Sequence, residues 1–480
     1  MNEFEFLEEI AADDPVVLGH AERIISGIVD SLQGDFNTKV QSVMNSVFED
    51  PEILKQFNGG IRYTTMVGSV VNRILDALPL GERRMSLLTI GTILPPDFVL
   101  PVMERIDSLA AEIKIQIGRI RKGRPYDVSA QGLLPARKAA IGLFDEHYHF
   151  SDEPELEEKL SNNSVLVSGG MVGLDFFVRS MLKRAKKAGK TALFVYPDNS
   201  FDSYKKIVAD HMEGGRAKHS EISTEPENGL HLSAKNVREF YEKNPENDQK
   251  VWCITPVGNP SGTKMTPDQL TEVCEAIVEC DPEAIILLDS TYIRVLDPKD
   301  ARALVARVIR NRTVMNRIIF LESFSKTHGL CSDRLAILFA ENRSLIADEI
   351  QNQIMSSTAG TPLNTSTEIL AISQLQPSEK QVFAQMYELW AHEREGLFNY
   401  FKQFPDLFDA QPHIKESELK DPMAPYLLMK PKEGVTAKQV ALETWCFGVE
   451  TAMGSGNYIR FAVGAISEPT YARYAEAEAV

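Results

Sequence analysis

Two apolar runs enclose a polar loop in the stretch Ile318-Ile-Phe-Leu-Glu-Ser-Phe-Ser-Lys-Thr-His-Gly-Leu-Cys-Ser-Asp-Arg-Leu-Ala-Ile-Leu-Phe-Ala340. The apolar ends predict two strands, so Lys326 lies in a loop at the mouth of a sheet. An amine placed there becomes a nucleophile if partial burial and a neighbouring cation favour loss of its proton. Arg334 offers that cation, and with the Ser323 hydroxyl it offers ligands for a phosphate. A solvated loop lysine is the simpler alternative, and only other motifs in the chain can distinguish it from a reactive lysine.

The composition is that of a globular protein with large cores, since 43% of the 480 residues are hydrophobic and 25% are charged. A formal charge of −17 argues against a nucleic-acid-binding or anionic membrane-binding surface. The five cysteines show no Cys-x-x-Cys spacing, so we expect neither disulfides nor a metal site. The acidic N-terminus lacks a signal-peptide core, and prolines interrupt the apolar residues 85–103. A cytoplasmic location without a membrane span is the default expectation.

Three regions follow one another along the chain. Residues 1–120 form an acidic, mostly helical extension, which we expect to contribute to a small domain. Residues 121–365 alternate short apolar runs with amphipathic helices, which predicts a layered α/β domain with a largely parallel sheet. Residues 366–480 begin with a long helical stretch and end in a small α+β domain. The predicted strands cover residues 164–167, 191–195, 250–254, 284–288, 317–321 and 335–339 of the large domain, and 426–429 and 458–463 of the small one.

A glycine-rich turn follows the first predicted strand, in Ser168-Gly-Gly-Met-Val-Gly173. Glycines at a strand-to-helix turn let backbone N–H groups close on a phosphate at the helix N-terminus. A tight turn without a ligand is the alternative. The dinucleotide pattern Gly-x-Gly-x-x-Gly is missing, so NAD is not implied.

Two further polar residues end predicted strands, where ligands bind in such sheets. Asn259 precedes Pro260, so its amide could donate to a ring oxygen or could simply form an Asn-Pro turn. Asp289 ends an almost wholly apolar run, with Tyr292 three residues later. A carboxylate there is costly unless it faces a cation such as a pyridinium nitrogen, although a helix-capping aspartate is the alternative.

The order and spacing of these motifs resemble the class I/II aminotransferases of the aspartate aminotransferase superfamily, which are the fold type I enzymes that depend on pyridoxal 5′-phosphate (PLP). The resemblance covers about residues 126–340 and includes a later arginine, Arg460. It implies a large PLP-binding domain with a mostly parallel, seven-stranded type of sheet between helices, and a smaller α+β domain. The matching motifs are Asn259-Pro260-x-Gly262, Asp289-x-x-Tyr292, and Ser323-x-Ser325-Lys326-x-x-Gly329 followed by Arg334.

The resemblance also implies roles for single residues. Lys326 forms the Schiff base with the cofactor and later carries the proton between the substrate Cα and the cofactor. Asp289 pairs with the ring nitrogen, and Tyr292 and Asn259 bind the phenolic oxygen. The implied phosphate ligands are Gly169, Gly170, Met171, Ser323, Ser325 and Arg334. The other implied contacts are Arg460 and Asn259 to the substrate, Phe201 stacked on the ring with Asn199 or Tyr204 as alternatives, and Tyr126 to the phosphate of a neighbouring subunit.

The implied activity is transfer of an amino group from an L-amino acid to a 2-oxo acid by a ping-pong route, in a homodimer with shared active sites. The same residues leave open another PLP-dependent reaction, namely elimination, decarboxylation or oxidation, and also a non-catalytic PLP-binding regulatory protein. We expect Arg294 to form a surface salt bridge rather than to contact a substrate. His328 is expected to be structural.

Overall fold

The computed structural model describes residues 95–123, 127, 129–201, 203–212, 217–358, 360–402, 405–435, 452–453 and 458–465. Their contacts define two compact units. The larger unit takes in the described parts of Thr92–Tyr400 and Ala410–Leu427, and the smaller one takes in those of Phe401–Asp409 and Leu428–Ile466. The predicted extension before residue 95 lies outside the described residues, and the domain boundaries at 120 and 365 stay predictions.

A seven-stranded sheet lies at the centre of the larger unit, in the order β1-β7-β6-β5-β4-β2-β3. Neighbours from β3 to β6 are parallel, whereas β7 runs antiparallel to both β1 and β6. This confirms the predicted α/β class and the mostly parallel sheet. The strands are β1 (Ser164–Ser168), β2 (Ala192–Pro197), β3 (Ala217–Ile222), β4 (Gln249–Ile254), β5 (Ile285–Asp289), β6 (Ile318–Ser323) and β7 (Leu335–Phe339).

The edge strand β3 was missed by the sequence prediction. Its sequence, Ala-Lys-His-Ser-Glu-Ile, is polar, and only Ala217 is fully buried. An edge strand has one neighbour and is partly solvated, so it lacks the continuous apolar run that marks the inner strands.

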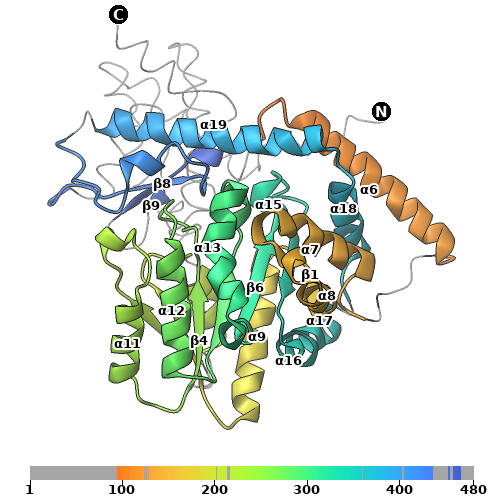
Figure 1. Ribbon diagram of the computed structural model, residues 1–480, viewed down its shortest axis with the longest axis horizontal. Helices are drawn as coiled ribbons and strands as arrows, with labels where there is room; N and C mark the ends of the chain where they lie inside the picture. The colour runs from red at the N-terminus through yellow and green to blue at the C-terminus, as the bar shows by residue number, and fades with distance from the viewer. Residues whose placement is uncertain are drawn as a thin grey trace, which may run out of the picture. The chain divides into compact units, whose positions relative to one another are not determined.

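Helices cover both faces of the sheet. Figure 1 shows α11, α12 and α13 side by side on one face, and α7 packs against α13. On the opposite face α9 packs against several strands and against α10 and α17. The helices of these layers are α7 (Leu134–Tyr148), α9 (Gly170–Lys187), α10 (Ser203–Asp210), α11 (Ala234–Lys243), α12 (Pro267–Cys280), α13 (Pro298–Arg310) and α17 (Gln351–Thr358). The remaining α-helices among the described residues are α6 (Leu100–Ile120), α8 (Pro154–Asn162), α14 (Arg312–Met315), α15 (Phe324–Thr327), α16 (Arg343–Leu345), α18 (Leu363–Ser373) and α19 (Pro377–Phe401).

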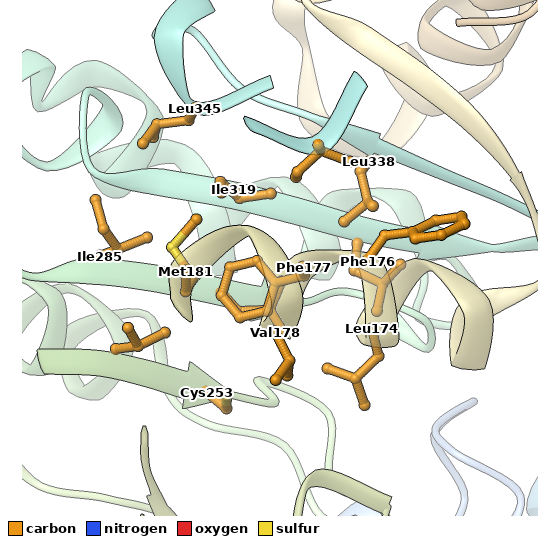
Figure 2. Packing of buried hydrophobic residues seen from close by; sticks show 14 of the residues in the cluster. Leu174, Phe176, Phe177, Val178, Met181, Cys253, Ile285, Ile319, Leu338 and Leu345 are labelled. Carbon is orange, nitrogen blue, oxygen red and sulfur yellow. The ribbon is translucent and has the colours of Figure 1, made fainter. Parts of the chain in front are cut away.

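An extensive apolar cluster lies between α9 and the sheet. Figure 2 shows Phe177 and Met181 of α9 among strand side chains that include Ile285 and Ile319. Side chains alternate along a strand, so residues at odd positions of β5 and β6 face α9. By the same alternation Asp289 and Ser323 face α9, whereas Glu322 faces the α7 side. The sheet therefore presents different polar residues on its two faces at the ends of β5 and β6.

A second sheet has the strand order β8-β10-β9. It consists of β8 (Tyr426–Met429), β9 (Ala452–Met453) and β10 (Ile459–Ala462), and β9 is antiparallel to β10. The two predicted strands of the small domain are thus confirmed, while the two-residue β9 was too short to be recognised. None of the helices that the structure describes is long and apolar enough to cross a membrane.

Candidate active site

The glycine turn, the Ser323 loop and Arg334 meet at the N-terminus of α9. Gly169 has φ 93° and is the N-cap of the helix. A Cβ on Gly169 would lie only 2.7–2.9 Å from the guanidinium of Arg334, so this side chain rests directly on the turn. A Cβ on Gly170 would lie 3.9 Å from Cβ of Ser323. Backbone N–H groups, a hydroxyl and a guanidinium thus surround one point, which is a suitable donor set for a phosphate.

The backbone around Arg334 fixes this arrangement. Arg334 has φ 61°, a left-handed conformation that is uncommon outside glycine. Its Nη1 donates to the carbonyl of Cys331 at 3.0 Å. The guanidinium is therefore held by its own loop as well as by the turn. Met171, in the first turn of α9, is 37% exposed, so its backbone rather than its side chain is the part suited to an anion.

Lys326 lies in the short helix α15, which begins after Ser323. The Ser323 hydroxyl accepts a hydrogen bond from the Ser325 N–H at 3.2 Å and caps this helix. Nζ of the partly buried Lys326 lies 3.8 Å from Sγ of Cys331, and that thiol donates to the carbonyl of Ser325 at 3.0 Å. Among the described residues Nζ forms no ion pair. Within the part of the chain that the structure describes, no carboxylate therefore holds this amine.

Asp289 ends β5 and is only 9% exposed. Its Oδ2 accepts a hydrogen bond from the hydroxyl of Tyr204 at 2.6 Å, and Oδ1 accepts one from the hydroxyl of Thr291 at 2.7 Å. Burial raises the pKa of Asp289, and the hydrogen bonds from Tyr204 and Thr291 oppose that shift. The Tyr204 hydroxyl also lies 3.0 Å from Oγ1 of Thr255. The carboxyl is thus fixed from both sides in a buried place where a cation would be favourable.

Tyr204 and Phe201 occupy different surroundings. Tyr204 is 1% exposed, and burial raises the pKa of its hydroxyl well above the ordinary value. The ring of Phe201 lies edge-on to it at 5.9 Å and packs against the cluster under α9 while keeping part of its surface exposed. Sequence reasoning named Tyr204 only as an alternative ring stacker and missed its bond to Asp289. Asn199, the other alternative, donates through its N–H to Oδ1 of Asp198 at 2.9 Å.

Tyr426 contacts two of the predicted motifs, and sequence reasoning did not single it out as a site residue. Its hydroxyl lies 2.8 Å from that of Tyr292, and the two rings meet edge-on. A Cβ on Gly262, which has φ 67°, would lie 2.0 Å from the carbonyl oxygen of Tyr426. Only glycine fits there, so the loop that carries Asn259 is anchored on the same residue as Tyr292. Both Asn259 and Tyr292 are buried.

Two predicted site residues are not among the described residues of the larger unit. Arg460 is on β10 in the smaller unit and is 7% exposed. Tyr126 lies outside the described residues. The residues brought together within the larger unit are those at the glycine turn, the Lys326 loop and the ends of β4 and β5.

Arg294 corrects an expectation from the sequence. It does not form a surface salt bridge, since its side chain is 6% exposed and packs between Phe144 and Phe324. Arg294 lies on the 3-10 turn η4 (Ile293–Val295), and its guanidinium packs against Phe324 of the Lys326 loop instead of reaching the surface. His328 is buried beside Phe324 and Phe383, in keeping with a structural role.

Comparisons with known proteins identify the fold and the family of this chain. Solved structures with the same fold include an aspartate aminotransferase from Thermus thermophilus with maleate (14% identity, TM-score 0.63, 87% of this chain and 96% of that one). A second similar structure is an aminotransferase from Mycobacterium tuberculosis, with 14% identity and a TM-score of 0.64 over 89% of this chain and 97% of that one. A third is the aspartate aminotransferase from Rhizobium meliloti, with 15% identity and a TM-score of 0.62 over 87% of this chain and 94% of that one. No curated protein sequence matches the chain. The family model described as aminotransferase class I and II matches residues 129–474, and this chain therefore belongs to that family.

Proposed function

We propose that this protein is a PLP-dependent aminotransferase that moves the amino group of an L-amino acid to a 2-oxo acid. The observation that carries the proposal is that four features lie at the same end of the central sheet, where the carboxyl ends of its parallel strands meet. Lys326 lies in the loop that begins at Ser323, the Arg334 guanidinium rests on Gly169 at a helix N-terminus, and the buried Asp289 ends β5. Membership of the aminotransferase class I and II family supports the same activity.

The residues present suit PLP in three respects. A Cβ at position 169 would crowd the guanidinium of Arg334. Because Gly169 has none, an anion can approach both the turn and the guanidinium. Asp289 is a buried carboxyl with hydrogen-bond donors but no cation of its own among its described hydrogen-bond partners. A protonated pyridine nitrogen would provide that cation. Lys326 is free of carboxylate partners among the described residues, as covalent attachment of a carbonyl requires.

When bound, PLP supplies a carbonyl that condenses with amines and a conjugated ring that accepts the electron pair of a bond broken at Cα. Lys326 would attach the cofactor through Nζ and would also be the base that carries a proton between the substrate Cα and the cofactor. Phosphate would be held by the backbone of Gly169, Gly170 and Met171 and by the side chains of Ser323 and Arg334, with Ser325 as a further donor.

The remaining residues would orient the ring and the substrate. Asp289 would keep a proton on the ring nitrogen, and Tyr204 and Thr291 would hold Asp289 in place. Tyr292, steadied by Tyr426, would donate to the phenolic oxygen together with Asn259. Phe201 would stack on the ring.

Substrate recognition and assembly complete the proposal. Arg460 would bind the substrate carboxylate as a bidentate partner, helped by Asn259. Tyr126 would reach the phosphate of a second subunit in a homodimer with shared sites. The enzyme would act on small molecules in cytoplasmic amino acid metabolism, with no nucleic acid or membrane partner.

A substrate screen followed by the cofactor spectrum tests the activity. Purified protein is expected to be yellow, and the correct amino acid should convert the bound cofactor to its amine form while a 2-oxo acid appears. A second, different 2-oxo acid should then restore the starting spectrum. Release of ammonia, carbon dioxide or peroxide without the amine form would indicate another PLP chemistry, and colourless protein that binds no PLP would refute the proposal.

A further inference from the structure

A buried arginine lies beneath the loop that carries Lys326. Arg294 follows Tyr292 by two residues, in the turn η4. Its guanidinium carbon lies 4.9 Å from the ring centroid of Phe144 and also 4.9 Å from that of Phe324. A guanidinium between two aromatic faces is attracted from both sides. Arg294 thus connects α7 to the residue that lies two positions before Lys326.

The carboxyl of Glu322 shares this buried space. Its side chain is 0% exposed, and its Oε1 accepts a hydrogen bond from Tyr148. Burial raises the pKa of Glu322 to about 8, while the charge of Arg294 and the bond from Tyr148 oppose the shift. Among the described residues, Oε2 of Glu322 and Nε and Nη1 of Arg294 have no hydrogen-bond partner. Below about pH 8 Glu322 is therefore mostly a neutral carboxyl, and the two aromatic rings are the main partners of the Arg294 charge.

The other polar groups around Arg294 do not replace its charge. Burial and the nearby Arg294 lower the pKa of His147 to about 3, and the same causes lower that of His328 well below its usual value. His328 packs between the rings of Phe324 and Phe383 at 5.4 Å and 4.5 Å. Aromatic side chains therefore pack against the buried side of the Lys326 loop, and among the three basic groups Arg294, His147 and His328 it is Arg294 that carries the positive charge there.

We propose that Arg294 is a positioning residue, which clamps the Lys326 loop to the Tyr292 turn through Phe324 and the buried carboxyl of Glu322. The effect on PLP binding rests on the proposed function, whereas the packing of Arg294 against the two segments does not depend on it. Arg294 acts on two segments: Tyr292 is the N-cap of the turn that carries Arg294, and Phe324, whose ring Arg294 contacts, lies two residues before Lys326 on α15. Loss of the guanidinium frees both segments at once.

Direct contact of Arg294 with a substrate does not fit these observations. A substrate carboxylate needs an accessible guanidinium, whereas Arg294 is 6% exposed and both of its faces are covered by aromatic rings. A purely structural role is the stronger alternative. It predicts that replacement lowers global stability without a selective effect on the two segments.

Hydrogen exchange on the full-length protein, with and without added PLP, separates these roles. Arg294→Met should speed amide exchange by about tenfold or more in residues 291–295 and 323–331, because the local opening that exposes them becomes easier. It should also weaken PLP binding by about tenfold. Phe324→Leu should have the same two effects. The double variant should exchange no faster, and bind PLP no more weakly, than the more strongly affected single variant, because both changes break one clamp.

Arg137→Met is the matched control. Arg137 is also 6% exposed, but it donates to the carbonyl oxygens of Gly132 and Ser161, away from the Lys326 loop. It should lower stability without selective exchange in the two segments. Equal exchange in the control, unchanged exchange in Arg294→Met, or effects that multiply in the double variant would overturn the proposal. If Arg294→Met does not fold, Arg294→Lys and Phe324→Leu decide by the same readout, and failure of wild-type protein to bind PLP would refute the proposed function alone.

Discussion

Asp289 and Glu322 are buried carboxyls near the ends of adjacent strands, yet they face opposite sides of the sheet. On the α9 face, donors from Tyr204 and Thr291 bind both oxygens of Asp289. On the α7 face, Glu322 has Tyr148 on one oxygen and the Arg294 charge nearby. Asp289 thus has donors but no cation among those partners, whereas Glu322 has its cation inside the fold. A carboxyl arranged like Asp289 suits an external cationic ligand, and one arranged like Glu322 suits a structural support.

The largest expected contrast between the faces is in catalysis. Asp289→Asn removes the negative charge but keeps the size of the side chain, so turnover should fall by about 10²- to 10⁴-fold. Glu322→Gln, the equivalent change on the other face, should lower turnover by less than about tenfold. The measurement is kcat and KM of both variants with the substrate found by the screen. Similar losses in the two variants would remove the distinction between the faces.

A smaller effect is expected at the residue that holds Asp289. Tyr204→Phe removes a hydrogen bond to a carboxylate, worth about 1.5–3 kcal/mol, so activity should fall by roughly 10- to 100-fold. The pH dependence of the cofactor spectrum should also change, because Asp289 loses a donor that stabilises its charged form. Tyr241→Phe is the control, since Tyr241 accepts from Trp252 at 3.1 Å instead. An unchanged spectrum in Tyr204→Phe would contradict the role given to Tyr204.

The glycine turn offers a test of the α9 face as the binding face. Gly169→Ala forces a Cβ at φ 93° to within 2.7–2.9 Å of the Arg334 guanidinium. Strain and displacement of Arg334 should weaken PLP binding by about tenfold. Gly142→Ala is the matched control, because a Cβ there meets nothing within 4 Å, and it should bind PLP normally. Equal PLP affinity in both variants would place the phosphate elsewhere.

A separate expected effect concerns stability rather than catalysis or cofactor binding, namely its dependence on pH. The pKa of Glu322 is raised from 4.5 to about 8 in the folded protein, so between these values the folded state binds the extra proton. The free energy of unfolding contributed by Glu322 should therefore fall by at most about 1.4 kcal/mol per pH unit as the pH rises through this window. The groups that act on Glu322 are Arg294, Tyr148 and Asp289.

Denaturant unfolding at several pH values can detect this slope. Wild type should lose stability relative to Glu322→Gln between about pH 5 and pH 8, because glutamine cannot bind the proton. Parallel curves for the two proteins would show that Glu322 titrates normally and would weaken the contrast with Asp289.

The sequence predicted the α9 face better than the α7 face, for a physical reason. Lys326, Ser323 and Gly169 lie in short motifs at strand ends, and a parallel sheet brings the carboxyl ends of its strands together on one side. Tyr204 and Tyr426 act through contacts across 85 and 134 residues, which no local pattern reveals. Arg294 and Glu322 are charged residues whose burial depends on the aromatic side chains that pack around them. The prediction of an exposed Arg294 was wrong because burial of a charge is decided by tertiary packing.

Covalent attachment of PLP to Lys326 is the most direct test of the account. Wild-type protein incubated with PLP and then treated with borohydride should carry the cofactor irreversibly, and peptide mass analysis should place it on Lys326 alone. Lys326→Ala should retain some reversible PLP binding through Gly169, Ser323 and Arg334 but should carry no fixed cofactor. Attachment at another lysine, or none in wild type, would contradict the central claim.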